Sequence, residues 1–213
     1  MLHLGFGQPK SVFCLGCHSD DIEIGCGGTL LRLLDQHPDL QVTWVVLSAA
    51  GERADEARQS AAAFLAKARQ PRIVIGDFRD RYFPYQGETI KNFIHDLAGQ
   101  VSPDLVFTQR RDDLHQDHRL VGELTWNAFR NHLILEYEIA KYEGDLGRPN
   151  IFVPLDESVC QRKIDTLLTA FPSQREKPWF TPDTFWALLR IRGLECNSPS
   201  RFAEGFHAAK VVL

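Results

Sequence analysis

Residues 11–35 read SVFCLGCHSDDIEIGCGGTLLRLLD, in which an apolar run is followed by a polar loop and a second apolar segment. The run at 11–17 predicts a buried strand, and the spacing at 27–35 predicts a helix that begins at the glycines. A strand that leads directly into a helix is the basic unit of a parallel α/β sheet. The polar loop therefore lies at the carboxyl end of a strand, where open sheets of this class bind ligands.

The same alternation of strand and helix continues along the chain. Further strands are predicted at 42–48, 72–75 and 104–108, with helices at about 53–67, 88–98 and 118–129 between and after them. Beyond residue 132 the order changes to strands at 133–139 and 150–153, helices at 157–170 and 182–191, and a last strand at 206–212. We predict an α/β fold with a Rossmann-like, mostly parallel sheet, helices on both faces and a C-terminal elaboration, in a single domain over 1–213.

Composition excludes several classes of protein. The chain has 213 residues, 44% of them hydrophobic and 24% charged, which is ordinary for a globular enzyme. A formal net charge of -4 gives no electrostatic basis for nucleic-acid binding. No apolar stretch reaches the length of a transmembrane span. No targeting segment is recognisable at the N-terminus, so a cytoplasmic location is expected.

Cysteine-based sites fit the sequence poorly. Cys14-Leu-Gly-Cys17-His18 matches the haem-attachment pattern, but that chemistry normally follows export and no signal segment precedes it. A redox dithiol usually opens a helix, whereas these two cysteines lie in the predicted strand. A four-cysteine zinc site needs a second close pair, and Cys160 and Cys196 are far apart in the chain.

Two polar clusters each follow a predicted strand. The first is His18-Ser-Asp20-Asp21, and the second is the run RRDDLHQDHR at 110–119, after the apolar residues 105–108. Because the carboxyl ends of parallel strands meet at one edge of a sheet, the two clusters can converge there. Two imidazoles and one carboxylate around a divalent ion, with positions left open for water, form a typical catalytic metal site.

The clusters resemble the motifs of a known family, the PIG-L/LmbE-like metal-dependent N-deacetylases. Cys17-His-Ser-Asp-Asp-Ile-Glu23 resembles the family's A-H-P-D-D-x-E, and His115-Gln-Asp-His118 resembles its H-x-D-H. The chain carries cysteine and serine where the family has alanine and proline, and neither change removes a ligand. Weaker matches are Arg53-Ala-Asp-Glu56, similar to R-x-x-E, and the segment FAEGF at 202–206, similar to A-E-x-F.

This resemblance implies a Rossmann-like fold, one divalent ion and hydrolysis of an acetamide on an amino sugar. The expected ion is zinc, with Fe²⁺ as the alternative. The expected substrate is a small molecule that contains a sugar of the N-acetylglucosamine type. Family members are often assembled, so a homo-oligomer is compatible with the resemblance. By position, the expected metal ligands are His18, Asp21 and His118.

Catalytic roles follow from the same resemblance. Asp20 is the expected general base. His115, oriented by Asp117, is expected to stabilise the oxyanion or to donate a proton to the leaving amine. Arg53 and Asp80 are the expected contacts to sugar hydroxyls. These roles agree with the chemistry of amide hydrolysis, which requires an activated water, stabilisation of negative charge and a proton for the departing nitrogen.

Two other functions share the same ligand set. Two histidines and one aspartate also form the facial triad of non-haem Fe(II) enzymes, although those sites usually lie in β-barrels rather than in alternating α/β folds. The second alternative is a protein that binds a metal without turnover. Such a protein would need neither the base nor the oxyanion group that Asp20 and His115 provide in a hydrolase.

Overall fold

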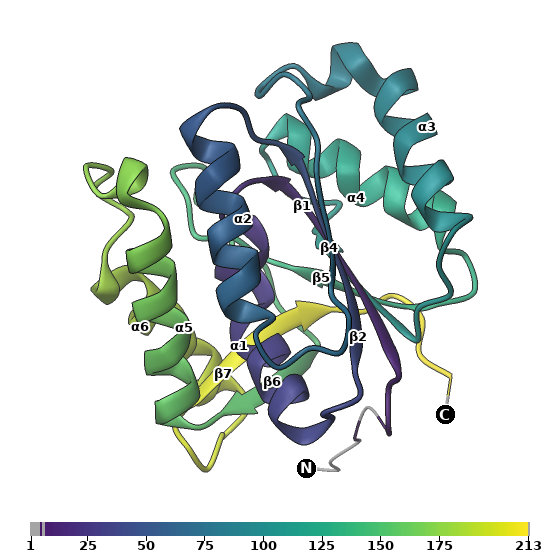
Figure 1. Cartoon of the computed structure of the whole chain (residues 1–213). Helices are drawn as coiled ribbons and strands as arrows, with labels where there is room; N and C mark the ends of the chain where they lie inside the picture. The colour runs from purple at the N-terminus through teal and green to yellow at the C-terminus, as the bar shows by residue number, and fades with distance from the viewer. Residues whose placement is uncertain (1–4, 6, 213) are drawn as a thin grey trace.

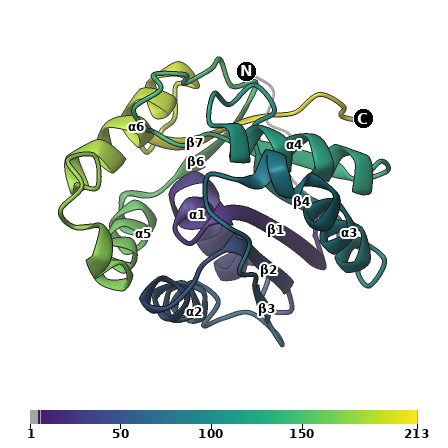
Figure 2. The ribbon, with the colours of Figure 1, turned by 90° about the horizontal axis from the view of Figure 1, so that it is seen from above.

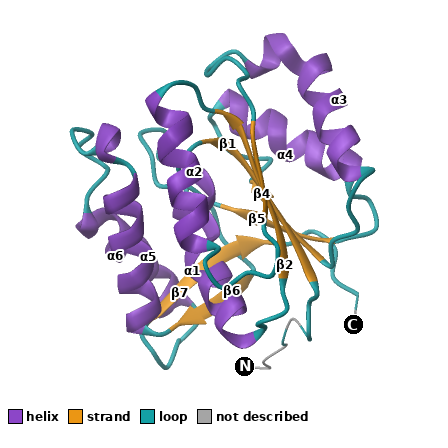
Figure 3. Ribbon diagram, in the orientation of Figure 1, coloured by secondary structure: helices purple, strands orange, loops and turns teal. Residues whose placement is uncertain are grey.

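The computed structural model describes Gly5 and residues 7–212, and its strands form one mixed sheet (Figure 3). The strands are β1 (Ser11–His18), β2 (Gln41–Ser48), β3 (Arg72–Ile75), β4 (Leu105–Gln109), β5 (Leu133–Tyr137), β6 (Ile151–Leu155) and β7 (Phe202–His207). The sheet has seven strands in the order β3-β2-β1-β4-β5-β7-β6. Neighbours from β3 to β5 run parallel, and β7 runs antiparallel to both β5 and β6. The predicted Rossmann-like fold with a C-terminal elaboration is confirmed.

Helices cover both faces of the sheet (Figures 1 and 2). They are α1 (Asp21–Gln36), α2 (Glu52–Phe64), α3 (Gly87–Ala98), α4 (Gln116–Ala128), α5 (Glu157–Ala170) and α6 (Pro182–Glu195), with the short 3₁₀ helices η1 (Phe83–Gln86) and η2 (Pro172–Gln174). One apolar core joins the sheet to α1, α2, α5 and α6, and a second joins it to α3 and α4. Among the described residues, no helix combines the length and apolarity required to cross a membrane.

Helix α1 begins at Asp21, earlier than the predicted start at residue 27. Acidic residues in its first turn, Asp21 and Glu23, favour this start because they complement the helix dipole. The glycines serve close packing inside the helix. A side chain at Gly25 would overlap the ring of Tyr137, and one at Gly27 would overlap the ring of Phe64.

The last strand is β7 at Phe202–His207, so the prediction of a strand at 206–212 placed it too late. The position of this strand is set by contacts with distant parts of the chain. Glu204 is buried in β7, and its carboxylate accepts hydrogen bonds from the backbone amides of Gly28 and Thr29 in α1 (2.8 and 2.6 Å). It also pairs with the buried ammonium of Lys163 (2.6 Å). A charged residue inside a strand conceals the alternation from which strands are predicted.

Candidate metal centre

The two polar clusters meet because their strands are neighbours. β1 ends at His18 and α1 begins at Asp21, while β4 ends at Gln109 and α4 begins at Gln116. β1 and β4 are adjacent and parallel, so the loops after them open at the same edge of the sheet (Figure 2). The predicted convergence of the two clusters is therefore present in the structure.

Three side-chain atoms have the spacing of metal ligands. His18 Nδ1 lies 3.2 Å from His118 Nε2 and 3.4 Å from Asp21 Oδ2, and His118 Nε2 lies 3.5 Å from Asp21 Oδ2. Nitrogen and oxygen ligands bound to one tetrahedral ion at about 2.0–2.2 Å are about 3.3–3.6 Å apart. The donor set and its spacing therefore fit a zinc-sized divalent ion.

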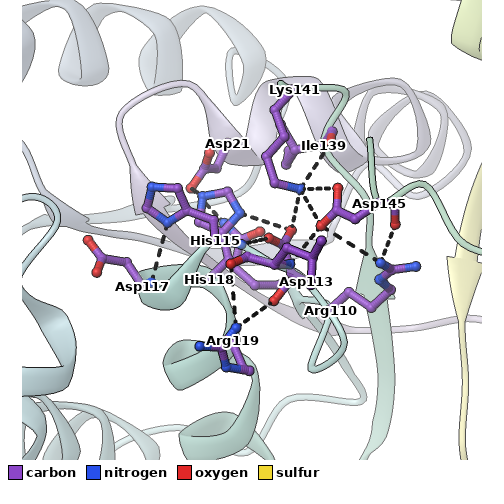
Figure 4. Close-up of polar contacts among 12 residues, drawn as sticks. Asp21, Arg110, Asp113, His115, Asp117, His118, Arg119, Ile139, Lys141 and Asp145 are labelled. Atoms are coloured by element: carbon purple, nitrogen blue, oxygen red, sulfur yellow. Dashed lines mark hydrogen bonds and ion pairs between the residues drawn. The ribbon is translucent and has the colours of Figure 1, made fainter. Parts of the chain in front are cut away.

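Asp113 contacts the outer ring nitrogen of His118, a candidate metal ligand (Figure 4). Its Oδ2 lies 3.1 Å from His118 Nδ1, which leaves Nε2 facing the site. Lys141 Nζ donates to the same oxygen at 2.9 Å and to Asp145 at 2.6 Å. A carboxylate bonded to the outer nitrogen of a histidine ligand sets its tautomer and ring orientation. Sequence reasoning missed Asp113, although it lies in the same acidic run as His115 and His118.

Gln109 holds the Asp21 carboxylate in place. Gln109 is fully buried at the end of β4, and its Nε2 donates to Asp21 Oδ2 at 2.6 Å. The backbone amide of His18 donates to the same oxygen at 2.8 Å. Burial alone would raise the pKa of Asp21, but the adjacent His118 and His18 lower it well below its usual value. Asp21 is therefore an ionised carboxylate with a fixed direction, as a metal ligand must be.

Asp113→Asn is expected to weaken metal affinity by about 10–100-fold, the usual effect of losing an outer partner of a metal ligand. The asparagine amide is uncharged, so it cannot replace the Asp113 carboxylate in its contacts with His118 and Lys141. Competition against a calibrated chelator measures the change. Asp112→Asn is the matched control, because Asp112 is the neighbouring aspartate and is exposed. Equal affinities in the two variants would contradict the supporting role of Asp113.

Asp20 is buried beside the candidate metal ligands and contacts Arg53. Its Oδ2 lies 3.3 Å from Arg53 Nη2, and Arg53 also lies 3.3 Å from Glu56. Burial raises the pKa of Asp20 above its usual value, although the Arg53 charge opposes the shift. A carboxyl group with a raised pKa is suited to accept and return protons. Arg53, which was expected to contact the substrate, therefore contacts Asp20, the expected general base.

His115 lies beside His18 and His118, the two candidate histidine ligands. One of its ring nitrogens is within 4.8 Å of a ring nitrogen of His18 and of His118. The backbone amide of Asp117 donates to His115 Nδ1 at 3.3 Å, so a neutral ring carries its proton on Nε2. Burial lowers the pKa of His115, and the charges of His118 and His18 lower it further. These contacts favour the neutral His115 ring, which donates through Nε2–H, over the imidazolium form.

The Asp117 carboxylate does not make the expected contact with His115; it anchors the loop before η1. It accepts hydrogen bonds from the backbone amides of Arg81 (2.6 Å) and Phe83 (3.2 Å). Arg81 has a φ of 66°, which costs free energy for a residue with a side chain and indicates a conformation held by its surroundings. The contact between Asp117 and His115 runs through the backbone amide instead.

Asp80 lies on this loop and faces His18, a candidate metal ligand. Its Oδ1 is 2.9 Å from His18 Nε2, and its side chain is 53% exposed. The contact with His18 lowers the pKa of Asp80. Asp80, the expected sugar contact, therefore contacts His18 through Oδ1, while the rest of its side chain is open to solvent. The structure brings all eight predicted site residues to one edge of the sheet, and adds Gln109, Asp113 and Lys141.

A family profile described as "PIG-L: GlcNAc-PI de-N-acetylase" matches residues 13–129, more than half of the chain. This protein belongs to the PIG-L family. The match includes both polar clusters and runs from β1 to the end of α4, so the resemblance of the two motifs is confirmed. PIG-L proteins form a deacetylase family, which places the chain among hydrolases. No match was found among curated protein sequences.

Solved structures share the fold of this PIG-L protein. N,N'-diacetylchitobiose deacetylase from Pyrococcus horikoshii has a TM-score of 0.74 at 21% identity, covering 95% of this chain and 85% of its own. The conserved protein TT1542 from Thermus thermophilus has a TM-score of 0.72 at 21% identity, with coverages of 95% and 96%. GalB, the 4-carboxy-2-hydroxymuconate hydratase from Pseudomonas putida, has a TM-score of 0.75 at 18% identity, with coverages of 96% and 98%. At these identities the likeness establishes the fold and not the substrate.

Proposed function

We propose that this PIG-L protein is a metal-dependent N-deacetylase that removes the acetyl group from an N-acetylglucosamine-type sugar in a small molecule. The observation that carries the proposal is the triangle of ligand atoms from His18, Asp21 and His118, with sides of 3.2–3.5 Å. Zinc is the proposed ion and Fe²⁺ the alternative. Membership of a deacetylase family supports the reaction class.

A divalent ion in such a site polarises a carbonyl oxygen and lowers the pKa of a coordinated water, to about 7 for zinc. Asp20 is the proposed group that takes the proton as the water attacks the amide carbon. Burial raises the pKa of this carboxyl above its usual value, so it binds the proton more strongly than a solvated aspartate would and can then pass it on. Arg53 keeps Asp20 in place and limits the rise of that pKa.

His115 is the proposed donor to the charge that develops on the amide oxygen. Its Nε2–H requires no prior protonation, because Nδ1 is occupied by the Asp117 amide. The leaving nitrogen needs a proton, and Asp20 can return the one that it took from the water. Arg53 and Asp80 remain the proposed contacts to sugar hydroxyls, through the exposed parts of their side chains.

The test is acetate release from a panel of N-acetylated sugars, with added zinc and with chelator. We expect equal amounts of acetate and free amine, and loss of both after metal removal. Oxygen consumption without acetate would favour the facial-triad iron alternative. Addition of water to a carbon–carbon double bond, the reaction class in the name of GalB, would also release no acetate. A metal-loaded protein that is inactive on the whole panel would contradict the proposal.

His115→Ala is expected to lower kcat by about 100–1,000-fold, the usual cost of losing one oxyanion donor. Metal content should be unchanged, because His118 and not His115 completes the ligand triangle. The measurements are single-turnover kinetics and elemental analysis on the same preparation. His95→Ala is the control, since His95 is a single exposed histidine on α3. Full turnover in His115→Ala would rule out the donor role.

A further inference from the structure

The segment 79–83, between β3 and α3, is tied to the first turn of α4. Asp117 accepts hydrogen bonds from the backbone amides of Arg81 (2.6 Å) and Phe83 (3.2 Å). Gln116 Nε2 donates to the Arg81 carbonyl at 2.6 Å. Two neighbouring residues of the second polar cluster therefore hold the same short stretch of backbone beside the candidate metal centre.

His18 Nε2 faces this segment and lacks a well-aligned acceptor. The atom is buried, and it has no hydrogen-bond partner of proper geometry among the described residues. Asp80 Oδ1 lies 2.9 Å from it and Asp117 Oδ2 lies 3.6 Å from it. Both Asp117 oxygens already accept backbone amides, whereas the Asp80 side chain is 53% exposed and can turn. Asp80 is therefore the carboxylate that can complete a hydrogen bond to Nε2.

The other ring nitrogen of His18 explains why this bond matters. Nδ1 belongs to the ligand triangle, 3.4 Å from Asp21 Oδ2 and 3.2 Å from His118 Nε2. A neutral imidazole has a single N–H, so a metal ion on Nδ1 requires the proton to be on Nε2. A buried N–H without an acceptor is costly. A carboxylate at this position satisfies it, fixes the ring orientation and raises the basicity of the ligand nitrogen.

The closed shape of the segment, as seen in this structure, depends on these contacts. The side chains of 79–82 are all exposed, and the buried Phe83 packs against His18 with ring centroids 6.0 Å apart. Arg81 has a φ of 66°, which is unfavourable for a residue with a side chain. Stretches with few buried contacts open locally at a small cost in free energy. The state of His18 therefore bears on how often this segment opens.

We propose that Asp80 is a positioning residue for His18, and that metal binding and closure of the segment 79–83 strengthen each other. Closure brings the Asp80 carboxylate to Nε2, and a metal ion on Nδ1 keeps the N–H there that binds this carboxylate. By linkage, the factor by which closure raises metal affinity equals the factor by which the metal favours closure. The inference rests on the metal dependence in the proposed function and adds that this side of the site is complete only in the loaded protein.

The first experiment measures zinc affinity by competition against a calibrated chelator. Asp80→Asn should lower the affinity about 10–100-fold, the usual effect of losing an outer partner of a metal ligand. The amide keeps the size of the side chain but removes its charge, and the exposed position tolerates the change. Asp77→Asn is the matched control, because Asp77 is an exposed aspartate three residues earlier. Its zinc affinity should equal that of the wild type.

The second experiment is limited trypsin digestion with and without saturating zinc, read by mass spectrometry. Cleavage after Arg79 and Arg81 requires the segment to open, and its rate follows the population of the open form. In the wild type, zinc should slow both cleavages by the same factor of about 10–100. In Asp80→Asn, zinc should have almost no effect on them. Cleavage after the exposed Arg69, on the turn before β3, is the internal control and should not depend on zinc.

Equal zinc affinities of Asp80→Asn and the wild type would overturn the inference. So would wild-type cleavage after Arg79 and Arg81 that is the same with and without zinc. A raised KM for an acetylated sugar at unchanged zinc affinity would show that Asp80 is only a substrate contact. The expected zinc results in a protein that releases no acetate would uphold the inference, while the deacetylase proposal alone would fail. A wild type that binds no zinc would refute both.

Discussion

Asp20→Asn is expected to retain the metal and to lose turnover by about 100–10,000-fold, the usual contribution of general acid–base catalysis. The amide has the size of the carboxyl group but cannot accept the proton of the attacking water. Metal retention follows from the geometry, because the ligand triangle uses Asp21 and not Asp20. Loss of this carboxyl also removes the ion pair to Arg53, which lies at the edge of the site.

Single-turnover rates and metal content, measured on one preparation, separate the two roles. Asp39→Asn is the matched control, because Asp39 is an exposed aspartate that pairs with Arg69 on the surface. If Asp20→Asn lost the metal while Asp21→Asn kept it, the two adjacent aspartates would have exchanged roles. Loss of metal from both variants would show that both carboxylates complete the ligand set.

His118→Ala is expected to release the metal almost completely. The fall in metal affinity should exceed roughly 100-fold, which is the upper end of the range for losing a residue that only supports a metal ligand. Removal of its imidazole leaves a pair of ligands, His18 and Asp21. Such a pair cannot hold a divalent ion against a chelator. His18→Ala and Asp21→Ala should act in the same way. Turnover should fall with metal content and should not return on addition of stoichiometric zinc.

Elemental analysis after dialysis against chelator checks this result, and His95→Ala again controls for loss of a histidine. Cys17 requires a separate variant, because its sulfur lies within 4.8 Å of ligand atoms of Asp21 and His118. Burial raises the pKa of the Cys17 thiol, which opposes ligation as a thiolate. We expect Cys17→Ser to keep its metal. If the three ligand variants all retained the metal and Cys17→Ser lost it, the metal would be bound through the Cys17 sulfur instead.

Periodicity predicted the parallel strands well because those strands are buried and apolar over their whole length. β1, β2 and β4 contain almost no exposed residue, and their predicted bounds agree with the observed ones within one residue. The end of the chain behaves differently. β7 includes the buried Glu204, whose charge is offset by Lys163 and by two amides of α1. These partners come from distant parts of the chain, so no local pattern indicates the strand.

The start of α1 shows a related limit. Glycines favour helix ends in isolation, and the sequence therefore predicted a helix from residue 27. In the folded chain Gly25 and Gly27 lie inside the helix, where they allow the backbone to approach Tyr137 and Phe64. Close packing against a ring that is far away in the sequence overrides the local preference. The earlier start also directs Asp21 from the first turn of α1 toward His118.

By itself, the sequence determined the order of strands and helices and the edge of the sheet at which His18 and His118 meet, and it predicted a set of candidate metal ligands there. These depend on local periodicity and on the rule that neighbouring parallel strands open their following loops at one edge. Only the tertiary structure decided which groups surround the ligands. Gln109 bonds Asp21, Asp113 bonds His118, and Arg53 contacts Asp20. Such contacts depend on angstrom-scale distances and on burial, which arise when separate elements pack together and which have no period in the chain.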